Sequence, residues 1–443
     1  MTYNETEKVL SDLLQKFPAI HILGKSIYKR LNYLIYKKKY NYKCYYKLHQ
    51  FQVGDKETFF GYYDKSPINS TNEYVIFHEA ERETNKLPDP SVPIRIHLYD
   101  VNANKVVSSF ASKTYNWQQG TKCQWIDATR FIFNDYDEKA DKYTSKIINA
   151  QTRSLEKIID FPIYDVYQNT ALSLNYDRLA VLRPDYGYRN RLNKRVTANL
   201  YEDGIYIVDL KKNKSELLIS IKDVIALSYN AKMSEAQHKV NHIMISPNGK
   251  KFIFLHRYFI DGKKQDRLIL SDINGKDLKV LADHDMVSHC CWWQNDKVVT
   301  FKRDFNQGDK YYAINVDNGH KEILGGKKIN AFGDGHPSIF NENMIFDTFP
   351  YKSRMRDLYM FNINTGELRK LGEFFEPFAY FGECRCDLHP KWSLDGKRIF
   401  IDSVHTGRRS LYMLELDDQL VDLNAKEPRK EVVNAYLPSH MEH

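Results

Sequence analysis

Short runs in which apolar and polar residues alternate recur along the chain. Each run ends in a turn rich in Asn, Asp, Gly or Lys, which is the pattern of a β-hairpin. The seven runs are IRIHLYDVNAN (94–104), YTSKIINAQTR (143–153), DGIYIVDLKKN (203–213), DRLILSDINGK (266–276), KYYAINVDNGH (310–320), RDLYMFNINTG (356–366) and RSLYMLELDDQ (409–419). This alternation predicts a chain built mainly from β-strands.

A second apolar run precedes each of these hairpin strands. The copies are NEYVIFHE (72–79), TRFIFNDY (129–136), DRLAVLRP (177–184), KKFIFLHR (250–257), DKVVTFKR (296–303), ENMIFDTF (342–349) and KRIFIDSV (397–404). Several follow a Ser-x-Asx-Gly type turn, as in SPNGKK (246–251) and SLDGKR (393–398). Seven repeats of this kind, with no long helical pattern between them, predict an all-β fold. We expect a seven-bladed β-propeller, closed so that few strand edges stay open.

The repeats define a propeller domain over residues 51–420. A basic helical extension precedes it at 1–50, and a polar C-terminal tail follows it at 421–443. Lys and Tyr dominate residues 25–50, which predicts either peripheral contact with an anionic membrane surface or a helix packed on the side of the propeller. A terminal strand from either end of the chain is expected to complete the last blade.

Charge and cysteine content narrow the partners and the compartment. Lys and Arg number 65 against 57 Asp and Glu, a net charge of +8 that is small for 443 residues. No nucleic-acid-binding motif accompanies this charge, so we expect no nucleic-acid partner. The six cysteines lack the spacing of a paired CxxC zinc site. The sequence shows neither a signal peptide nor a membrane-spanning apolar run, which predicts a cytoplasmic protein, with membrane association through 25–50 left open.

Histidines occupy the same position in four consecutive repeats. His242 and His389 each stand four residues before the serine of the turn, in HIMISPNG and HPKWSLDG. His336, in DGHPSIFNEN, and His289, in VSHCCWWQNDK, take the same position. Because propeller blades radiate from one axis, we expect these side chains to converge on one mouth of the central channel. Imidazole is the commonest side-chain metal ligand and a frequent general base.

Polar side chains accompany these histidines. Arg385 and Asp387 precede His389, while Arg183 and the pair 118–119 stand near corresponding positions of earlier blades. Arginine can bind a carboxylate through two hydrogen bonds, and aromatic rings pack on sugar rings. The pattern favours a binding site for an acidic sugar, and hydrogen bonding between blades is the alternative role. The substrate-binding candidates are Gln119, Tyr188, Asp387, His405 and Arg408.

Several common catalytic motifs are absent from the chain. There is no G-x-S-x-G elbow, no P-loop and no G-x-G-x-x-G at a strand-to-helix turn. The sequence therefore argues against a common serine hydrolase, a nucleotide-driven enzyme and a dinucleotide-dependent oxidoreductase.

The repeats and the histidines together resemble a known group of proteins. HPKWSLDGKRIFIDSVHTGRRSLYMLEL (389–416) and HIMISPNGKKFIFLH (242–256) resemble the blades of Tol-type propellers. With the histidines added, the chain is similar to the oligogalacturonate lyases and their uncharacterised relatives among bacterial polysaccharide-locus proteins. FFGYYDKSP (59–67), NWQQGTKCQW (116–125) and RPDYGYR (183–189) look typical of those relatives.

The resemblance implies a divalent metal ion, typically manganese, held in the channel mouth by three histidines and a glutamine. By blade position, His289, His336 and His389 match the metal-binding histidines. The lyases also carry a His-x-His pair in one blade, and this chain departs from that pattern, since the second residue after His389 is Lys391.

Three functions are compatible with this pattern. The first is a lyase that cleaves an oligosaccharide containing uronic acid by β-elimination, with His242 or His256 as the base and Arg183 with Arg385 binding the carboxylate. The second is a glycosidase or another glycan-processing enzyme of capsule or envelope assembly, which would use a pair of carboxylates among Asp334, Asp387 and Asp402. The third is a non-catalytic propeller that binds an acidic polysaccharide or a protein.

Overall fold

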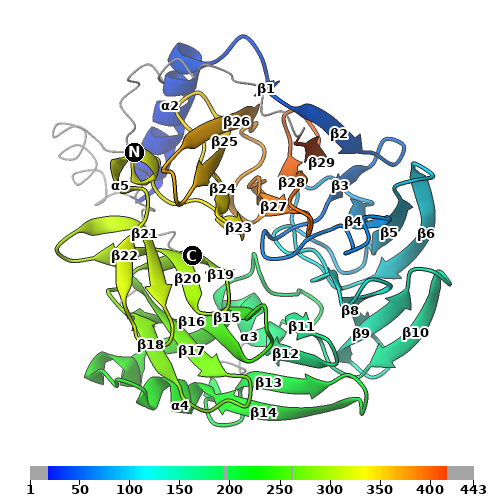
Figure 1. Cartoon of the computed structure of the whole chain (residues 1–443), viewed down its shortest axis with the longest axis vertical. Coiled ribbons are helices and arrows are strands. Elements are labelled where there is room, and N and C mark those ends of the chain that lie inside the picture. The colour runs from blue at the N-terminus through cyan, green and yellow to red at the C-terminus, as the bar shows by residue number, and fades with distance from the viewer. Residues whose placement is uncertain (1–17, 193–197, 261–262, 417–443) are drawn as a thin grey trace.

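Seven antiparallel sheets form a ring around a central axis (Figure 1). They are seen in a computed structural model that describes residues 18–192, 198–260 and 263–416. The arrangement confirms the predicted seven-bladed β-propeller. The predicted C-terminal tail, 421–443, lies outside the described residues.

The first three blades follow one another along the chain, each with four strands. Blade 1 contains β3 (Glu57–Phe59), β4 (Tyr74–Ala80), β5 (Ile94–Asp100) and β6 (Lys105–Ser112). Blade 2 contains β7 (Gln124–Trp125), β8 (Arg130–Asp137), β9 (Lys142–Asn149) and β10 (Ser154–Ile159). Blade 3 contains β11 (Asp165–Tyr167), β12 (Thr170–Leu174), β13 (Gly204–Asp209) and β14 (Lys214–Ser220).

Blades 4 and 5 repeat this order. Blade 4 contains β15 (Gln237–Ile245), β16 (Lys251–Ile260), β17 (Lys263–Asp272) and β18 (Lys279–Ala282). Blade 5 contains β19 (Val287–Trp293), β20 (Lys297–Asp304), β21 (Gly308–Asn315) and β22 (Lys321–Ile323). In Figure 1, β15 and β19, the strands that begin these two blades, lie nearer the centre of the ring than the strands that follow them.

The last two blades each include a strand from the N-terminal part of the chain. Blade 6 contains β23 (Ser338–Phe340), β24 (Asn343–Asp347), β25 (Met355–Asn362) and β26 (Leu368–Phe375), with β1 (Tyr42–Cys44) added outside β26. Blade 7 contains β27 (Lys391–Trp392), β28 (Arg398–Ser403) and β29 (Ser410–Glu415), and its fourth strand is β2 (Lys47–Phe51). The N-terminal side of the chain therefore closes the ring.

The core lies between neighbouring blades, because the inner strands are covered on both faces. Nearly all of β16 is buried, on both sides of the strand. This explains why the second apolar run of a repeat, such as FIFL at 252–255, is continuous instead of alternating. The outer strands, such as β6 and β14, are mostly exposed or half-buried, and only their C-terminal ends are buried.

Ring closure through β2 leads to a stability prediction for Phe51. Its ring is buried and lies 5.6 Å from the ring of Phe77 in blade 1 and 6.2 Å from that of Phe400 in blade 7. We expect Phe51→Ala to lower the free energy of unfolding by about 3–5 kcal/mol, because a buried aromatic side chain is lost. Urea denaturation measures the change. Phe305→Ala, which alters a largely exposed phenylalanine, should cost much less, and equal losses would contradict the prediction.

Apart from α2 (Pro18–Tyr36), the helices in the described part of the chain are short and lie in the connections. These are α3 (Tyr176–Leu182), α4 (Ile221–Ala226), α5 (Gly326–Asn330), η2 (Ala231–Glu235) and η3 (Gly382–Cys384). The strand predicted at 177–184 is wrong, since α3 occupies this region and the blade takes 170–174 instead. Asn175 caps α3 by accepting hydrogen bonds from the backbone N–H groups of Asp177 and Arg178.

Helix α2 is the long helix of the described chain and packs against blade 6 (Figure 1). The Tyr33 ring lies 5.7 Å from the Phe375 ring and 5.4 Å from the Phe378 ring. Among the described residues, no helix combines the length and apolar character needed to cross a bilayer.

Candidate metal centre and surrounding site

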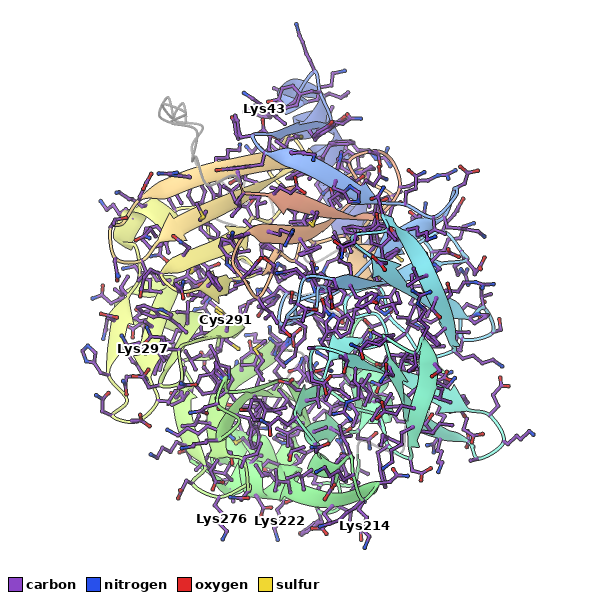
Figure 2. The ribbon with its side chains drawn as sticks, turned by 45° about the vertical axis from the view of Figure 1, so that its right-hand side comes forward. Lys43, Lys214, Lys222, Lys276, Cys291 and Lys297 are labelled. Carbon is purple, nitrogen blue, oxygen red and sulfur yellow. The ribbon has the colours of Figure 1, made fainter. Side chains whose placement is uncertain are left out.

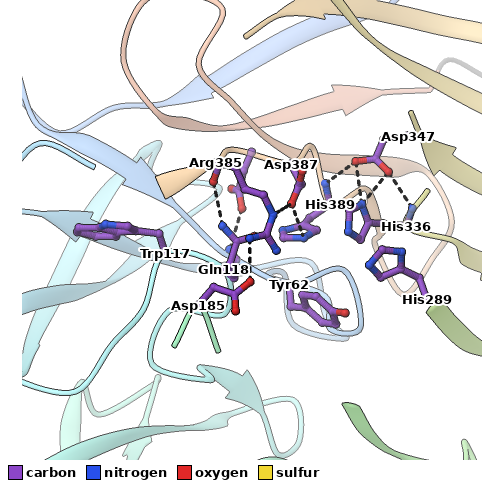
Figure 3. Close-up of polar contacts among 12 residues, drawn as sticks. Tyr62, Trp117, Gln118, Asp185, His289, His336, Asp347, Arg385, Asp387 and His389 are labelled. Atoms are coloured by element: carbon purple, nitrogen blue, oxygen red, sulfur yellow. Dashed lines mark hydrogen bonds and ion pairs between the residues drawn. The ribbon is translucent and has the colours of Figure 1, made fainter. Parts of the chain in front are cut away.

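Four histidines stand at the inner strands of blades 4 to 7. His242 lies in β15 and His289 in β19, whereas His336 and His389 come just before β23 and β27. The ring centroids of His289 and His336 are 4.0 Å apart, and those of His336 and His389 are 4.4 Å apart. The structure thus brings the three predicted metal ligands together (Figure 3). We refer to His289, His336 and His389 as the histidine cluster.

The backbone around these histidines departs from regular strand geometry. The register of β15 against β16 shifts at His242, and that of β19 against β20 shifts at His289. The backbone φ angles of His242 and His389 are 52° and 45°, in the left-handed region that residues other than glycine rarely adopt. Bulges and strained backbone of this kind re-aim side chains and are frequent beside functional sites.

Carboxylates orient two members of the histidine cluster. Nδ1 of His289 lies 3.1 Å from a carboxylate oxygen of Asp334, and Nδ1 of His336 lies 2.8 Å from one of Asp347. Asp347 also accepts hydrogen bonds from the backbone N–H groups of His336 and His389. Such contacts fix the ring and leave Nε2 as the free nitrogen, which is the usual arrangement behind a metal-binding histidine.

The protonation state of the histidine cluster suits the binding of a cation. Nε2 of His389 is buried and has no hydrogen-bond partner among the described residues. Burial lowers the pKa of His289, and burial together with His336 holds the pKa of His389 well below its usual range. The imidazoles of His289 and His389 are therefore neutral at pH 7 and can offer a lone pair to a metal ion.

Asp387 is a further acidic neighbour of this cluster, with a carboxylate oxygen 3.9 Å from Nε2 of His389. Ligand atoms of His336, Asp387 and His389 all lie within 4.8 Å of one another. Asp387 precedes His389 by two residues, in an Asp-x-His run. Its carboxylate is already paired, at 2.8 Å from Arg356 and 2.7 Å from Arg385. These two arginines hold the pKa of Asp387 well below its usual range, so the group stays charged.

Tyr62 and Tyr63 bring blade 1 into contact with the histidines. The Tyr62 ring stacks on the His242 ring at 5.1 Å, and its hydroxyl lies 3.4 Å from His242 Nε2. Tyr63 donates to the carbonyl of Cys290 and accepts from the backbone N–H of the same residue. Gly61, with φ of +109°, allows this path, because a Cβ there would lie 2.9 Å from the backbone of Gln119. The pattern of repeats could not reveal this segment, since it occurs once.

His242 is buried with one nitrogen unpartnered. Within the described part of the chain, its Nδ1 has no hydrogen-bond partner, and neither does either polar side-chain atom of Asn241. Burial and the nearby Arg257 guanidinium hold the pKa of His242 well below its usual range. Unpaired buried polar groups are rare and indicate unmet contacts with water or a ligand. This side of the site thus offers several free polar atoms.

Arginines and tyrosines border the histidines on the side of blades 3 and 4. Arg385 donates to Asp185 at 2.8 Å and to the Tyr186 hydroxyl at 3.2 Å (Figure 3). The Arg183 guanidinium lies over the Tyr186 ring at 5.3 Å and 2.9 Å from Asp185, with its side chain 32% exposed. The guanidinium of Arg183 is therefore more accessible than that of Arg385. Arg257 of β16 pairs with Asp266 at 2.8 Å.

Gln118 and Gln119 lie beside this group of residues. Gln118 donates to the carbonyl of Arg385 at 2.9 Å, and Gln119 donates to the Tyr164 hydroxyl at 3.0 Å. That hydroxyl also accepts from the backbone N–H of His242. The buried side-chain oxygens of both glutamines have no hydrogen-bond partner in the described ranges. Gln119 is therefore adjacent to His242.

Four other predicted site residues lie elsewhere. Neighbouring residues of a strand point to opposite faces. Because Arg257 faces Tyr62, the side chain of His256 points to the other face of β16, where it contacts His238 and Arg267. The remaining three have their own settings. Tyr188 stacks on Tyr176 at 4.2 Å, His405 packs against Tyr42 and Phe374, and Arg408 donates to the carbonyl of Asp55 at the outer edge of blade 7.

The predicted glycosidase carboxylates all have partners. Asp334 binds His289 and Ser288, and Asp387 binds two arginines. Asp402 accepts hydrogen bonds from the backbone N–H groups of residues 60 and 61, with N–O distances of 2.9 and 2.8 Å. Each carboxylate therefore has a structural partner for both oxygens, which argues against a free acid–base pair.

His256 and His238 predict a dependence of stability on pH. Arg267 can only donate, so Nδ1 of His256 accepts, and its Nε2–H donates to Nδ1 of His238 at 2.9 Å. His238 in turn donates to the carbonyl of Met233 at 2.8 Å. Both rings are therefore neutral in the folded state, and burial lowers the pKa of each.

An unfolded histidine has a pKa of about 6.5. As the pH falls below this value, the unfolded chain binds protons that the folded chain does not, so we expect stability to fall by about 1.4 kcal/mol per pH unit for each such histidine. Urea denaturation between pH 7.5 and pH 5, values that bracket the pKa of about 6.5, tests this. His256→Gln should make the fall less steep, and the exposed His320→Gln should leave it unchanged. An unaltered slope in His256→Gln would contradict the assignment.

The fold and the site together define a class: a seven-bladed propeller with a largely buried histidine cluster where the inner strands of blades 5, 6 and 7 meet. Among solved structures, the chain is similar in fold to an oligogalacturonate lyase in complex with manganese, with a TM-score of 0.59, 14% identity, and coverage of 86% of this chain and 95% of that one. An oligogalacturonate lyase from Vibrio parahaemolyticus gives a TM-score of 0.58 and 11% identity over 85% of this chain and 97% of the other.

An acylaminoacyl peptidase from Pyrococcus horikoshii is more distant, with a TM-score of 0.45, 11% identity, and coverage of 79% of this chain and 50% of that one. At these identities the comparisons show the propeller fold. No protein-family model and no curated protein matches the sequence.

Proposed function

We propose that this protein is a metal-dependent lyase that cleaves an oligosaccharide containing uronic acid by β-elimination. The observation that carries the proposal is the histidine cluster, in which two imidazoles are oriented by carboxylates and Nε2 of the third is buried without a hydrogen-bond partner among the described residues. Arg183 lies at the same site with a partly exposed guanidinium. The likeness in fold to a lyase in complex with manganese supports the same conclusion.

The residues present fit a divalent metal ion. Neutral imidazole nitrogens suit manganese, zinc and iron, and His289, His336 and His389 would hold the ion. Manganese is our first candidate because the similar lyase structure contains it. When bound, the metal would neutralise the uronate carboxylate and make the proton on C5 more acidic.

Residues of the chain would carry out the proton transfers. Arg183 would bind the carboxylate of an acidic oligosaccharide. We assign the proton of His242 to Nε2, facing the Tyr62 oxygen, so that the unpartnered Nδ1 takes the proton from C5. The C–H electron pair forms the C4–C5 double bond, and the C4–O bond breaks. Burial raises the pKa of Tyr62 well above its usual range, so its hydroxyl keeps a proton to donate to the leaving oxygen.

The proposal distinguishes a lyase from a glycosidase by the product. We expect wild-type protein, supplied with manganese, to generate the ultraviolet absorbance of an unsaturated uronate from at least one member of a panel of uronic-acid oligosaccharides. New reducing ends without this absorbance would favour the glycosidase alternative. No new ends with any substrate would overturn an enzymatic role and favour a binding propeller.

A further inference from the structure

Helix α2 presents an apolar stripe to solvent. Ile27, Leu31, Leu34 and Ile35 are spaced so that they share one helical face, and their side chains are 49%, 55%, 60% and 75% exposed. A helix that packs on a globular domain ordinarily turns such residues inward. Here the inward face carries Tyr33, against Phe375 and Phe378, so the apolar stripe points away from the propeller.

The surroundings of the stripe are strongly basic. Residues 18–54 contain eight Lys and Arg and no Asp or Glu. Among the described residues of this stretch, Arg30, Lys37, Lys39 and Lys43 are exposed, and Figure 2 shows Lys43 at the end of the molecule that carries α2. Lysine is depleted in protein–protein interfaces, whereas lysine beside apolar side chains is typical of helices that lie on anionic membranes. The charge therefore favours a lipid surface over a second protein chain.

Exposed tyrosines extend the same surface. Tyr36, Tyr40, Tyr42 and Tyr45 are between 37% and 49% exposed and follow the stripe along the chain. Tyrosine rings concentrate at the boundary between the polar and apolar parts of a bilayer, where both ends of the side chain find suitable surroundings. An apolar stripe, a lysine border and a set of tyrosines together match a helix that lies in this boundary.

We propose that α2 and the segment after it bind the surface of an anionic lipid bilayer, with the stripe in the headgroup region and the lysines on the lipid phosphates. Because Phe378 belongs to the loop that continues to Arg385, Asp387 and His389, this contact would hold the candidate site close to the membrane. The inference stands on exposure and charge, and it does not depend on the proposed lyase activity.

Sedimentation with vesicles tests the proposal on the full chain. We expect binding to vesicles of equal parts phosphatidylglycerol and phosphatidylcholine, little binding to phosphatidylcholine alone, and release at high salt, because salt screens the lysines. The double substitution Leu34→Gln with Ile35→Gln should weaken binding by about tenfold or more. Leu155→Gln with Ile158→Gln is a matched control on β10, where these two side chains are 48% and 49% exposed, and it should bind as wild type.

Three results would overturn the proposal. The first is wild-type protein that fails to bind the anionic vesicles. The second is equal binding by the α2 double variant and the β10 double variant. The third is a dimer, measured by analytical ultracentrifugation, that the α2 double variant abolishes while neither protein binds vesicles, since this would assign the stripe to a second copy of the chain.

Discussion

His336→Ala is expected to weaken the binding of manganese by more than about 100-fold. Loss of a carboxylate that orients a metal-binding histidine typically lowers metal affinity by about 10- to 100-fold, and loss of the histidine itself lowers it further. Asp347→Asn should therefore weaken manganese binding by about 10- to 100-fold. His336 lies at the centre of the histidine cluster, between His289 and His389. Titration calorimetry with manganese measures both effects.

The control for this prediction is His320→Ala, which removes an exposed histidine from blade 5. It should bind manganese as tightly as wild type. Circular dichroism checks that each variant is folded. Wild-type affinity in His336→Ala, with a folded protein, would contradict the assignment of the histidine cluster as a metal site.

Asp387→Asn is expected to lower the free energy of unfolding by about 3 kcal/mol. Removing one partner of a buried ion pair typically costs 3–5 kcal/mol, because a buried charge is left uncompensated. We expect the lower end, since Arg356 keeps Glu376 and Arg385 keeps Asp185. Urea denaturation at neutral pH measures the loss.

Asp160→Asn provides a matched control for the same charge change. Asp160 pairs with Lys142 at 2.7 Å, and both side chains are more than 40% exposed. The exposed pair should contribute less than about 1 kcal/mol. Equal losses in Asp387→Asn and Asp160→Asn would show that the buried arginine–aspartate network does not stabilise the fold as described.

The number of blades could be predicted from the sequence, because every blade repeats the same alternation and turn. The run at 177–184 was assigned to a strand because a short apolar run fits a helix and a strand equally well. The structure resolves it as α3, with Asn175 as the capping residue. The sequence predicts a terminal strand in the last blade but not which end supplies β2, because a single terminal strand has no repeat of its own to align with.

The candidate site was predictable only where its residues recur in register. The histidines occupy equivalent positions in four blades, so their convergence followed from the symmetry of the fold. His256 is predicted as a candidate base, yet alternation along β16 sends its side chain away from the face that Arg257 turns toward Tyr62. Asp347 is the last residue of β24 and Asp402 the last but one of β28, which are the second strands of their blades, and both accept hydrogen bonds from backbone N–H groups near the site. Alignment of the repeats places Asp347 and Asp402 near the end of the same strand, and this shared position could have identified both residues from the sequence.

The most direct test of the central claim joins metal content to activity. Purified protein is analysed for bound metal, dialysed against a chelator, and assayed for unsaturated product with and without added manganese. The account predicts about one bound divalent ion per chain, loss of product formation on chelation, and recovery with manganese. Full formation of unsaturated product by metal-free protein would contradict it, as would the absence of any bound metal after manganese is supplied.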